Sequence, residues 1–164
     1  MERQLRTHQV ARVGELLKAR GETVAVAESS TGGLLAASLL SVAGASAYLL
    51  GGSVVYTLKS RRELLKISAT DVEGLSPLSE PIVERFAARA REQLDATWGI
   101  AELGAAGPAG ARYGHPAGTC VLAVVGPVTL TTTVQTSSDD REANMWAFTS
   151  TAITLLEQAL NSAE

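Results

Sequence analysis

Three hydroxyl side chains and two glycines stand together between an apolar run and a helix-forming run. They are Ser29, Ser30, Thr31, Gly32 and Gly33. The first backbone N–H groups of a helix have no partner within the helix, so a strand-to-helix turn can bind an anion. A serine hydroxyl placed there could attack a carbonyl carbon, with nearby N–H groups as donors to the developing oxyanion.

The runs on either side support this placement. Residues 23–27 are short and apolar and indicate a buried parallel strand, and residues 34–40 continue with helix formers. A glycine costs a helix roughly 1 kcal/mol relative to alanine, which indicates that some group approaches the backbone closely at Gly32 and Gly33. Ordinary N-capping by a serine or threonine is the alternative. Glu28 could be an acid or base, or only a carboxylate favoured beside a helix N-terminus.

Two further polar loops are expected at the same edge of the sheet. Residues 52–57 indicate a second strand, and a basic loop follows it. Residues 99–104 indicate a third strand, which opens into the longest glycine-rich loop of the chain, residues 105–116. Ligands of open α/β sheets bind beyond the carboxyl ends of the strands, so these loops and the turn at residues 29–33 could build one site.

The rest of the chain alternates helices and strands without an internal repeat. A first helix is expected at about residues 4–20. Another is expected to be capped by Ser79, with Pro81 in its first turn, and to run to about residue 97. Residues 118–125 and 128–135 indicate a hairpin that turns at Gly126, and a last helix follows residues 137–140. The expected fold is an α/β, three-layer α/β/α sandwich with a mixed sheet of about five strands.

Composition limits the classes of protein that fit. A chain of 164 residues with 46% hydrophobic content fits one globular domain, residues 1–164. The sequence has no apolar stretch of membrane-spanning length, and its charged start does not resemble a signal peptide, so a cytoplasmic location is expected. A net charge of −3 and 4% aromatic residues argue against nucleic acid as a partner. Cys120 lies in an apolar run and is expected to be a buried core residue.

Several familiar catalytic patterns are missing from the sequence. It contains no P-loop motif, no nucleophile-elbow Gly-x-Ser-x-Gly motif and no Ser-x-x-Lys motif. It also lacks a cluster of histidines or cysteines suited to zinc, so no metal site is expected.

The motifs taken in order resemble those of the CinA carboxy-terminal domain family over nearly the whole chain. The matching segments are residues 27–33, 52–57, 104–108, 116–119 and 140–141. This family includes stand-alone nicotinamide-nucleotide amidases, and the same domain is fused behind another domain in competence/damage-inducible CinA proteins. The resemblance implies hydrolysis of nicotinamide mononucleotide, a small-molecule nucleotide, to nicotinate mononucleotide and ammonia, without metal or cofactor. It also implies a homo-oligomer.

The resemblance also implies roles for individual residues. Ser29 matches the nucleophile of the family and Tyr56 its catalytic tyrosine, whereas the lysine that serves as the base is replaced by Arg61. Arginine stays protonated and is a poor base, so Arg61 could instead bind the substrate phosphate. Lys59 is the expected substitute, because burial makes a lysine amine a better base; a solvated basic patch is the alternative.

Further residues are expected to bind the substrate or to support the site. They are Ser30, Thr31, Gly32, Gly33, Gly104, Gly107, His115 and Arg141. Arg141 could bind a phosphate or pair with a neighbouring aspartate, and His115 could be a base or a surface loop residue. The chain departs from the family pattern at Leu103, at His115 and at Met145, where threonine, lysine and arginine are usual.

Two functions therefore stand side by side. The first is an amidohydrolase acting on nicotinamide mononucleotide, with Ser29 as nucleophile, Tyr56 and Lys59 in proton transfer, and backbone N–H groups of residues 31–33 or 104–107 as oxyanion donors. The second is a diverged CinA-like domain that binds a nucleotide or a partner chain without turnover.

Overall fold

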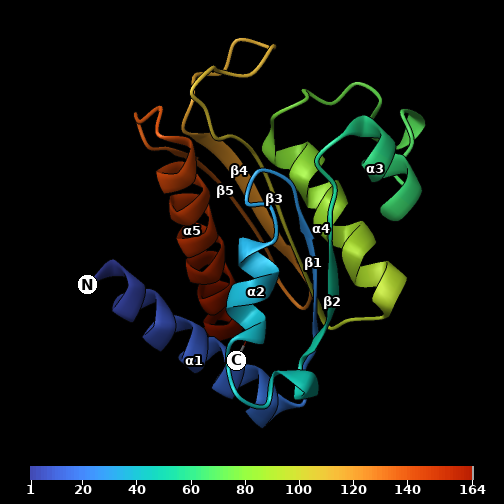
Figure 1. Ribbon diagram of the computed structural model, residues 1–164. Helices are drawn as coiled ribbons and strands as arrows, with labels where there is room; N and C mark the ends of the chain where they lie inside the picture. The colour runs from blue at the N-terminus through green and yellow to red at the C-terminus, as the bar shows by residue number, and fades with distance from the viewer. Residues whose placement is uncertain (164) are drawn as a thin grey trace.

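The computed structural model of the chain describes residues 1–163 and shows a five-stranded sheet between two layers of helices (Figure 1). The strands are β1 (Val24–Glu28), β2 (Leu49–Val54), β3 (Trp98–Ala105), β4 (Thr119–Val125) and β5 (Thr129–Gln135). The helices are α1 (Glu2–Arg20), α2 (Leu34–Leu40), α3 (Leu58–Leu64), α4 (Glu80–Leu94) and α5 (Arg141–Ser162), with short 3-10 turns η1 (Ala45–Ala47) and η2 (Thr70–Val72). The predicted α/β/α sandwich is confirmed.

The sheet is mixed, and its strand order brings the expected loops to one edge. The order is β2-β1-β3-β4-β5; β1 pairs in parallel with β2 and β3, and β4 is antiparallel to β3 and β5. The carboxyl ends of β1, β2 and β3 therefore share an edge, where β4 begins opposite Ala105 and β5 ends opposite Thr119. The hairpin between β4 and β5 confirms the turn predicted at Gly126.

Each face of the sheet has its own hydrophobic core. Helices α1, α2 and α5 cover one face and α4 covers the other (Figure 1). Along β1, Val24 and Val26 belong to the first core, and Ala25 and Ala27 belong to the second. Both faces of β1 are thus buried, as its unbroken apolar sequence requires. In residues 1–163, no helix combines the length and apolar content needed to cross a lipid bilayer.

The segment after β2 differs from the prediction. The ladder between β1 and β2 ends at the pair Glu28 and Val54, because β1 turns away there, so Tyr56 lies beyond the strand. The basic segment that follows forms helix α3 and not a loop. A capping box starts it: the Thr57 hydroxyl accepts the Ser60 N–H, and the Ser60 hydroxyl accepts the Thr57 N–H.

Helix α4 is shorter than predicted, and its start is built differently. It ends at Leu94, because Asp95 adopts the left-handed conformation (φ 50°), and does not continue to residue 97. Ser79 occupies the N-cap position, but its hydroxyl donates to the Ser76 carbonyl (2.8 Å) and makes no cap hydrogen bond. Pro81 does lie in the first turn, as predicted.

Candidate functional site

Glu28 caps helix α2 with its side chain. It is the last residue of β1, and its Oε1 accepts the N–H groups of Gly33 (2.8 Å) and Leu35 (3.1 Å), while its Oε2 accepts that of Ala36 (2.9 Å). These are the N–H groups that have no partner within the first turn of a helix. The structure therefore gives Glu28 a capping role, the second of the two roles considered for it.

A second buried carboxylate, Glu102 of β3, holds the residues that follow Glu28. Glu28 and Glu102 are paired across the two strands. Glu102 Oε1 accepts the N–H of Ser29 (2.6 Å) and of Thr31 (2.8 Å), and Oε2 accepts the hydroxyl of Ser30 (2.7 Å). The Thr31 hydroxyl lies 2.7 Å from Glu28 Oε1 and 2.9 Å from Glu102 Oε1, and its one proton can serve either. The turn at residues 29–33 thus surrounds two carboxylates of the protein itself.

Glu102 has no exposed surface, and burial raises the pKa of its carboxyl, although the hydrogen bonds from Thr31, Ser30 and Ser29 oppose the rise. Glu102 was not among the site residues predicted from the sequence. The available signal was a carboxylate within an otherwise apolar strand, since a buried carboxylate needs several hydrogen bonds.

The expected oxyanion donors at residues 31–33 are already occupied. The N–H groups of Thr31 and Gly33 donate to the two carboxylates, and that of Gly32 donates to the Ser29 carbonyl (3.2 Å), so this part of the prediction is wrong. Among residues 1–163, the N–H groups of Ser30, Ala106 and Gly107 donate to no protein acceptor. Their hydrogen-bonding capacity is not used by the described part of the chain.

The side chain of Ser29 is free to react. Ser29 is 5% exposed, and its hydroxyl makes no hydrogen bond to any residue in the described part of the chain. It is not among the buried polar atoms that lack a partner, so solvent reaches it. A free hydroxyl on a fixed backbone, at the carboxyl edge of the sheet, meets the first need of a nucleophile.

The glycines of the site serve the protein backbone. Gly32 (φ 63°) and Gly33 (φ 107°) adopt left-handed conformations that favour glycine, which accounts for glycine at both positions without a ligand. Gly104 is needed for packing, because a Cβ there would lie 2.7 Å from the Ser30 Oγ and 2.9 Å from Phe148 Cε2.

Arg141, the first residue of α5, joins two other loops of the site. Its Nη2 donates to the Tyr56 hydroxyl (3.1 Å) and its Nη1 to the Gly107 carbonyl (2.5 Å). No ion pair links it to Asp139 or Asp140 in residues 1–163. Its guanidinium group thus spans from the end of β2 to the glycine-rich loop.

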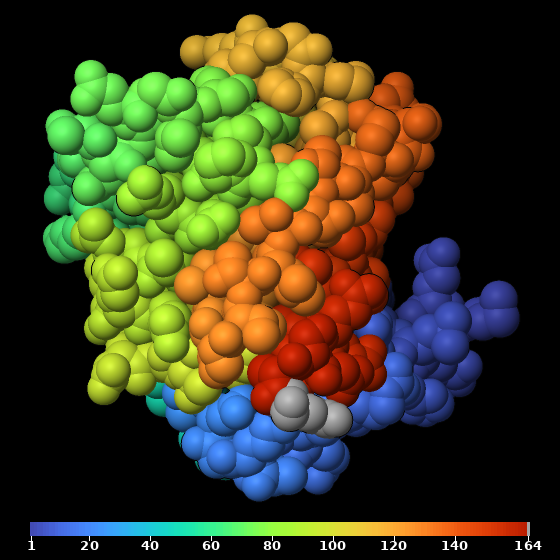
Figure 2. Space-filling model, turned by 180° about the vertical axis from the view of Figure 1, so that it is seen from behind, coloured from blue at the N-terminus to red at the C-terminus, as the bar shows by residue number. Residues whose placement is uncertain are grey.

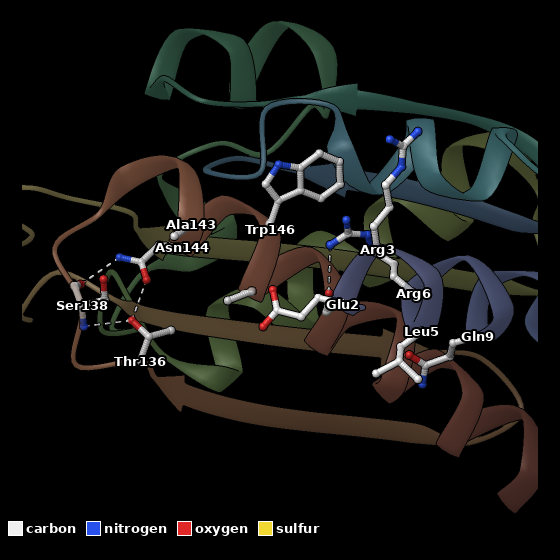
Figure 3. Close-up of a pocket in the computed structure, with 12 residues that line it drawn as sticks. Glu2, Arg3, Leu5, Arg6, Gln9, Thr136, Ser138, Ala143, Asn144 and Trp146 are labelled. Atoms are coloured by element: carbon white, nitrogen blue, oxygen red, sulfur yellow. Dashed lines mark hydrogen bonds between the residues drawn. The ribbon is translucent and has the colours of Figure 1, made fainter.

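Asn144 anchors the same loop one turn further along α5. Its Nδ2 donates to the carbonyls of Ala106 and Ser138 (2.8 Å each), and its Oδ1 accepts the Thr136 hydroxyl (2.6 Å); Figure 3 shows the contacts with Ser138 and Thr136. Asn144 was not among the predicted site residues. Its position within a helix pattern held no signal, because its contact with the glycine-rich loop, at Ala106, joins residues 38 positions apart in the sequence.

Lys59 and Arg61, the two basic residues of α3 that were predicted to belong to the site, lie in different surroundings. Arg61 is half-buried; its Nε donates to the Val55 carbonyl (3.4 Å), and its guanidinium carbon lies 5.2 Å from the Phe86 ring centre. Burial lowers the pKa of Arg61, and Tyr113 and Glu102 partly oppose this, so the group remains a cation. Lys59 is exposed and makes no hydrogen bond or ion pair within residues 1–163. The structure does not bring Lys59 to Ser29.

Two further residues named in the sequence analysis, His115 and Cys120, lie in the glycine-rich loop and in β4. His115 is half-buried; its Nδ1 is buried without a partner among the described residues, and its ring meets Tyr113 edge-on at 6.5 Å. Cys120 is fully buried, with its thiol 3.6 Å from Glu102 Oε2, and burial raises the pKa of this thiol well above its usual range. The expectation of a core cysteine is confirmed.

In the part of the chain that the structure describes, no cluster of acidic, histidine and cysteine side chains is suited to a metal ion.

A separate groove of about 660 Å³ lies between the first half of α1 and α5 (Figure 3). The start of α1 stands away from the body of the molecule (Figure 2). The groove is lined in part by Arg6, whose guanidinium carbon lies 4.0 Å above the Trp146 ring. Neither Ser29 nor Tyr56 lines it, so it is distinct from the predicted site.

Comparison with known proteins identifies relatives of the whole fold. Residues 6–160 match the family described as the CinA C-terminal domain. A CinA-like protein of Acaryochloris marina is 46% identical over 115 residues, which are 70% of this chain and 27% of that protein. A CinA-like protein of Anaeromyxobacter dehalogenans is 39% identical over 144 residues, 88% of this chain and 35% of that protein. The chain thus spans about a third or less of these relatives.

Solved structures of similar chains share the architecture along their full length. The competence damage-inducible protein A from Klebsiella pneumoniae aligns with a TM-score of 0.90 at 30% identity, covering 97% of this chain and 99% of that one. The competence/damage inducible protein CihA from Agrobacterium tumefaciens aligns with a TM-score of 0.86 at 28% identity, covering 95% of each chain.

Proposed function

Because the chain belongs to the CinA C-terminal domain family, we propose that it hydrolyses nicotinamide mononucleotide to nicotinate mononucleotide and ammonia. One observation carries the proposal: the Ser29 hydroxyl has no hydrogen-bond partner in residues 1–163, although the turn that presents it is held by two buried carboxylates. A serine that served only as a helix cap would use its hydroxyl on a backbone N–H.

In this proposal Ser29 Oγ attacks the carboxamide carbon while its proton passes to the Tyr56 oxygen and the Tyr56 proton passes to the carboxamide nitrogen in the same step. The oxyanion accepts the N–H of Ser30, which follows the nucleophile directly, as in other serine hydrolases. The oxyanion then collapses, the carbon–nitrogen bond breaks, and ammonia leaves. Water then hydrolyses the ester on Ser29, which releases nicotinate mononucleotide and restores the hydroxyl. Because the Tyr56 oxygen accepts a hydrogen bond from Arg141, its own proton remains available for this relay.

Arg61 is the proposed ligand of the substrate phosphate. It is the half-buried cation of α3, and a planar guanidinium group can bind two phosphate oxygens at once. Arg141 is proposed to orient Tyr56 and the glycine-rich loop. The mechanism proposed here does not use Lys59; the role in proton transfer predicted for it from the sequence would require the first turn of α3 to move toward Ser29.

A second candidate function is nucleotide binding without turnover. It is favoured by the exposed position of Lys59 together with an arginine, Arg61, where the family resemblance places a lysine base. In this case the Ser29 turn would remain as a binding element.

The test is ammonia release from nicotinamide mononucleotide by the purified chain. We expect the Ser29→Ala variant to lose activity by about 10³-fold or more, as loss of a nucleophile does in serine hydrolases. Ser38→Ala is the matched control, because the Ser38 hydroxyl donates to the Leu34 carbonyl within α2 (2.7 Å). Undiminished activity in Ser29→Ala would exclude the nucleophile assignment. Saturable binding without ammonia release by the unaltered chain would favour the second function.

A further inference from the structure

Two paired carboxylates beneath the Ser29 turn perform different tasks. Glu28 accepts the N–H groups of Leu35 and Ala36 in helix α2, and at the end of the turn it also accepts the N–H of Gly33 and the hydroxyl of Thr31. Glu102 accepts groups of the turn itself: the N–H of Ser29, the N–H of Thr31 and the hydroxyl of Ser30. Each of these donor–acceptor distances is 2.8 Å or less, as is typical of charge-assisted hydrogen bonds.

We propose that Glu102 is a positioning residue for Ser29, an inference that rests on the proposed role of Ser29 as nucleophile. Glu102 fixes the backbone on both sides of Ser30, because it binds the N–H groups of Ser29 and Thr31 through one oxygen. It leaves the N–H of Ser30 unoccupied among residues 1–163. The nucleophile and the one free N–H group of the turn are thus set relative to each other by a single carboxylate from the neighbouring strand.

Glu102 does not itself contact the substrate. It has no exposed surface, and its other neighbour is the buried thiol of Cys120, 3.6 Å from Oε2. Its effect must therefore pass through the turn. Loss of the carboxylate would leave two N–H groups and one hydroxyl without an acceptor, and the turn would move to satisfy them with water. Small shifts of a nucleophile reduce the rate of reaction far more than the affinity for substrate.

Three variants separate positioning from simple packing. Glu102→Leu removes both acceptor oxygens. Glu102→Gln keeps one oxygen that can accept the N–H groups of Ser29 and Thr31, and its amide can donate to the Ser30 hydroxyl. Glu80→Gln is the matched control, because the Glu80 carboxylate also accepts two hydroxyls, those of Thr131 and Thr133 on β5, outside the turn.

The first measurement is amide hydrogen exchange by NMR, which needs no substrate. In Glu102→Leu we expect the N–H groups of Ser29 and Thr31 to exchange about tenfold faster or more, with the centre of β3 unchanged. Glu102→Gln should stay within about threefold of the unaltered chain, and Glu80→Gln should not differ at these two residues. If Glu102→Leu does not fold, Glu102→Asp, whose carboxylate is withdrawn by one methylene, replaces it with the same expectation.

The second measurement is steady-state kinetics with nicotinamide mononucleotide. We expect kcat to fall about 100-fold in Glu102→Leu while KM changes less than about twofold, with most of kcat regained in Glu102→Gln. Unchanged exchange at Ser29 and Thr31 in the folded Glu102→Leu or Glu102→Asp variant overturns the inference. A fall in kcat that is matched by an equal-fold rise in KM also overturns it. An unaltered chain that releases no ammonia contradicts the proposed function instead, and the exchange data still decide whether Glu102 holds the turn.

Discussion

The Ser29 turn and the segment from Tyr56 to Arg61 follow two adjacent strands, β1 and β2, at one edge of the sheet, yet they are built in different ways. Residues 28–31 are buried, and residues 29–31 are hydrogen-bonded to the carboxylates of Glu28 and Glu102. Tyr56 is 58% exposed, and α3 contains no buried residue. The half of the site that presents the nucleophile is thus part of the core, whereas the half assigned to proton transfer is surface.

The largest expected effect is a difference between the two regions in how much loss of a threonine hydroxyl lowers the free energy of unfolding. Thr31→Val removes the hydroxyl that serves the two carboxylates, so we expect it to lower the free energy of unfolding by about 2 kcal/mol. Thr57→Val, the matched change at the start of α3, should cost about 1 kcal/mol or less, because that hydroxyl is an exposed cap. Urea unfolding measures both. Equal losses would mean that the turn is no more tightly held than α3.

The next largest effect is expected on activity, at Arg141, the residue that contacts Tyr56. Arg141→Lys replaces a guanidinium group that reaches both Tyr56 and Gly107 with an amine that can reach only one of them. We expect kcat/KM for nicotinamide mononucleotide to fall about tenfold, with unfolding free energy unchanged within about 0.5 kcal/mol. An unchanged kcat/KM would show that this bridge does not orient Tyr56.

The pH dependence of stability should come from the buried region. Burial raises the pKa of Glu102 above its ordinary value of 4.5, so the folded chain keeps that proton to higher pH than the unfolded chain does. Stability from this group is therefore greatest at low pH and falls as pH rises above 4.5, by up to about 1.4 kcal/mol per pH unit, until the folded-state pKa is passed.

Glu102→Gln lacks this titration. Relative to the unaltered chain, the variant should gain stability as pH rises through the same window, as followed by urea unfolding at several pH values. A constant difference between the two proteins at all pH values would contradict the raised pKa.

The smallest effect is expected at Lys59. Its side chain is exposed and makes no hydrogen bond or ion pair in the described residues, so Lys59→Met should change kcat by less than about twofold. Ammonia release under saturating nicotinamide mononucleotide measures this. A loss of tenfold or more would mean that α3 moves during turnover and that Lys59 takes part in proton transfer.

Local patterns were sufficient to predict most of the fold. The apolar strand before Ser29, the start of α2 at Leu34, the hairpin at Gly126 and the last helix after Asp140 are all encoded in neighbouring residues. Helix α3 was missed because its short basic sequence has no buried face, and its capping box of Thr57 and Ser60 was not recognised. A helix with no buried face shows no hydrophobic period from which it could be predicted.

The sequence by itself determined that Ser29 stands on a strand-to-helix turn, because an apolar strand, glycines able to adopt positive φ and a run of helix formers follow one another there. Only the tertiary structure decided what fills that turn. Glu102 meets Ser29 through the pairing of β1 with β3, and Arg141 meets Tyr56 through the docking of α5. These partners are separated by 73 and 85 positions along the chain, so only the assembled sheet brings them together.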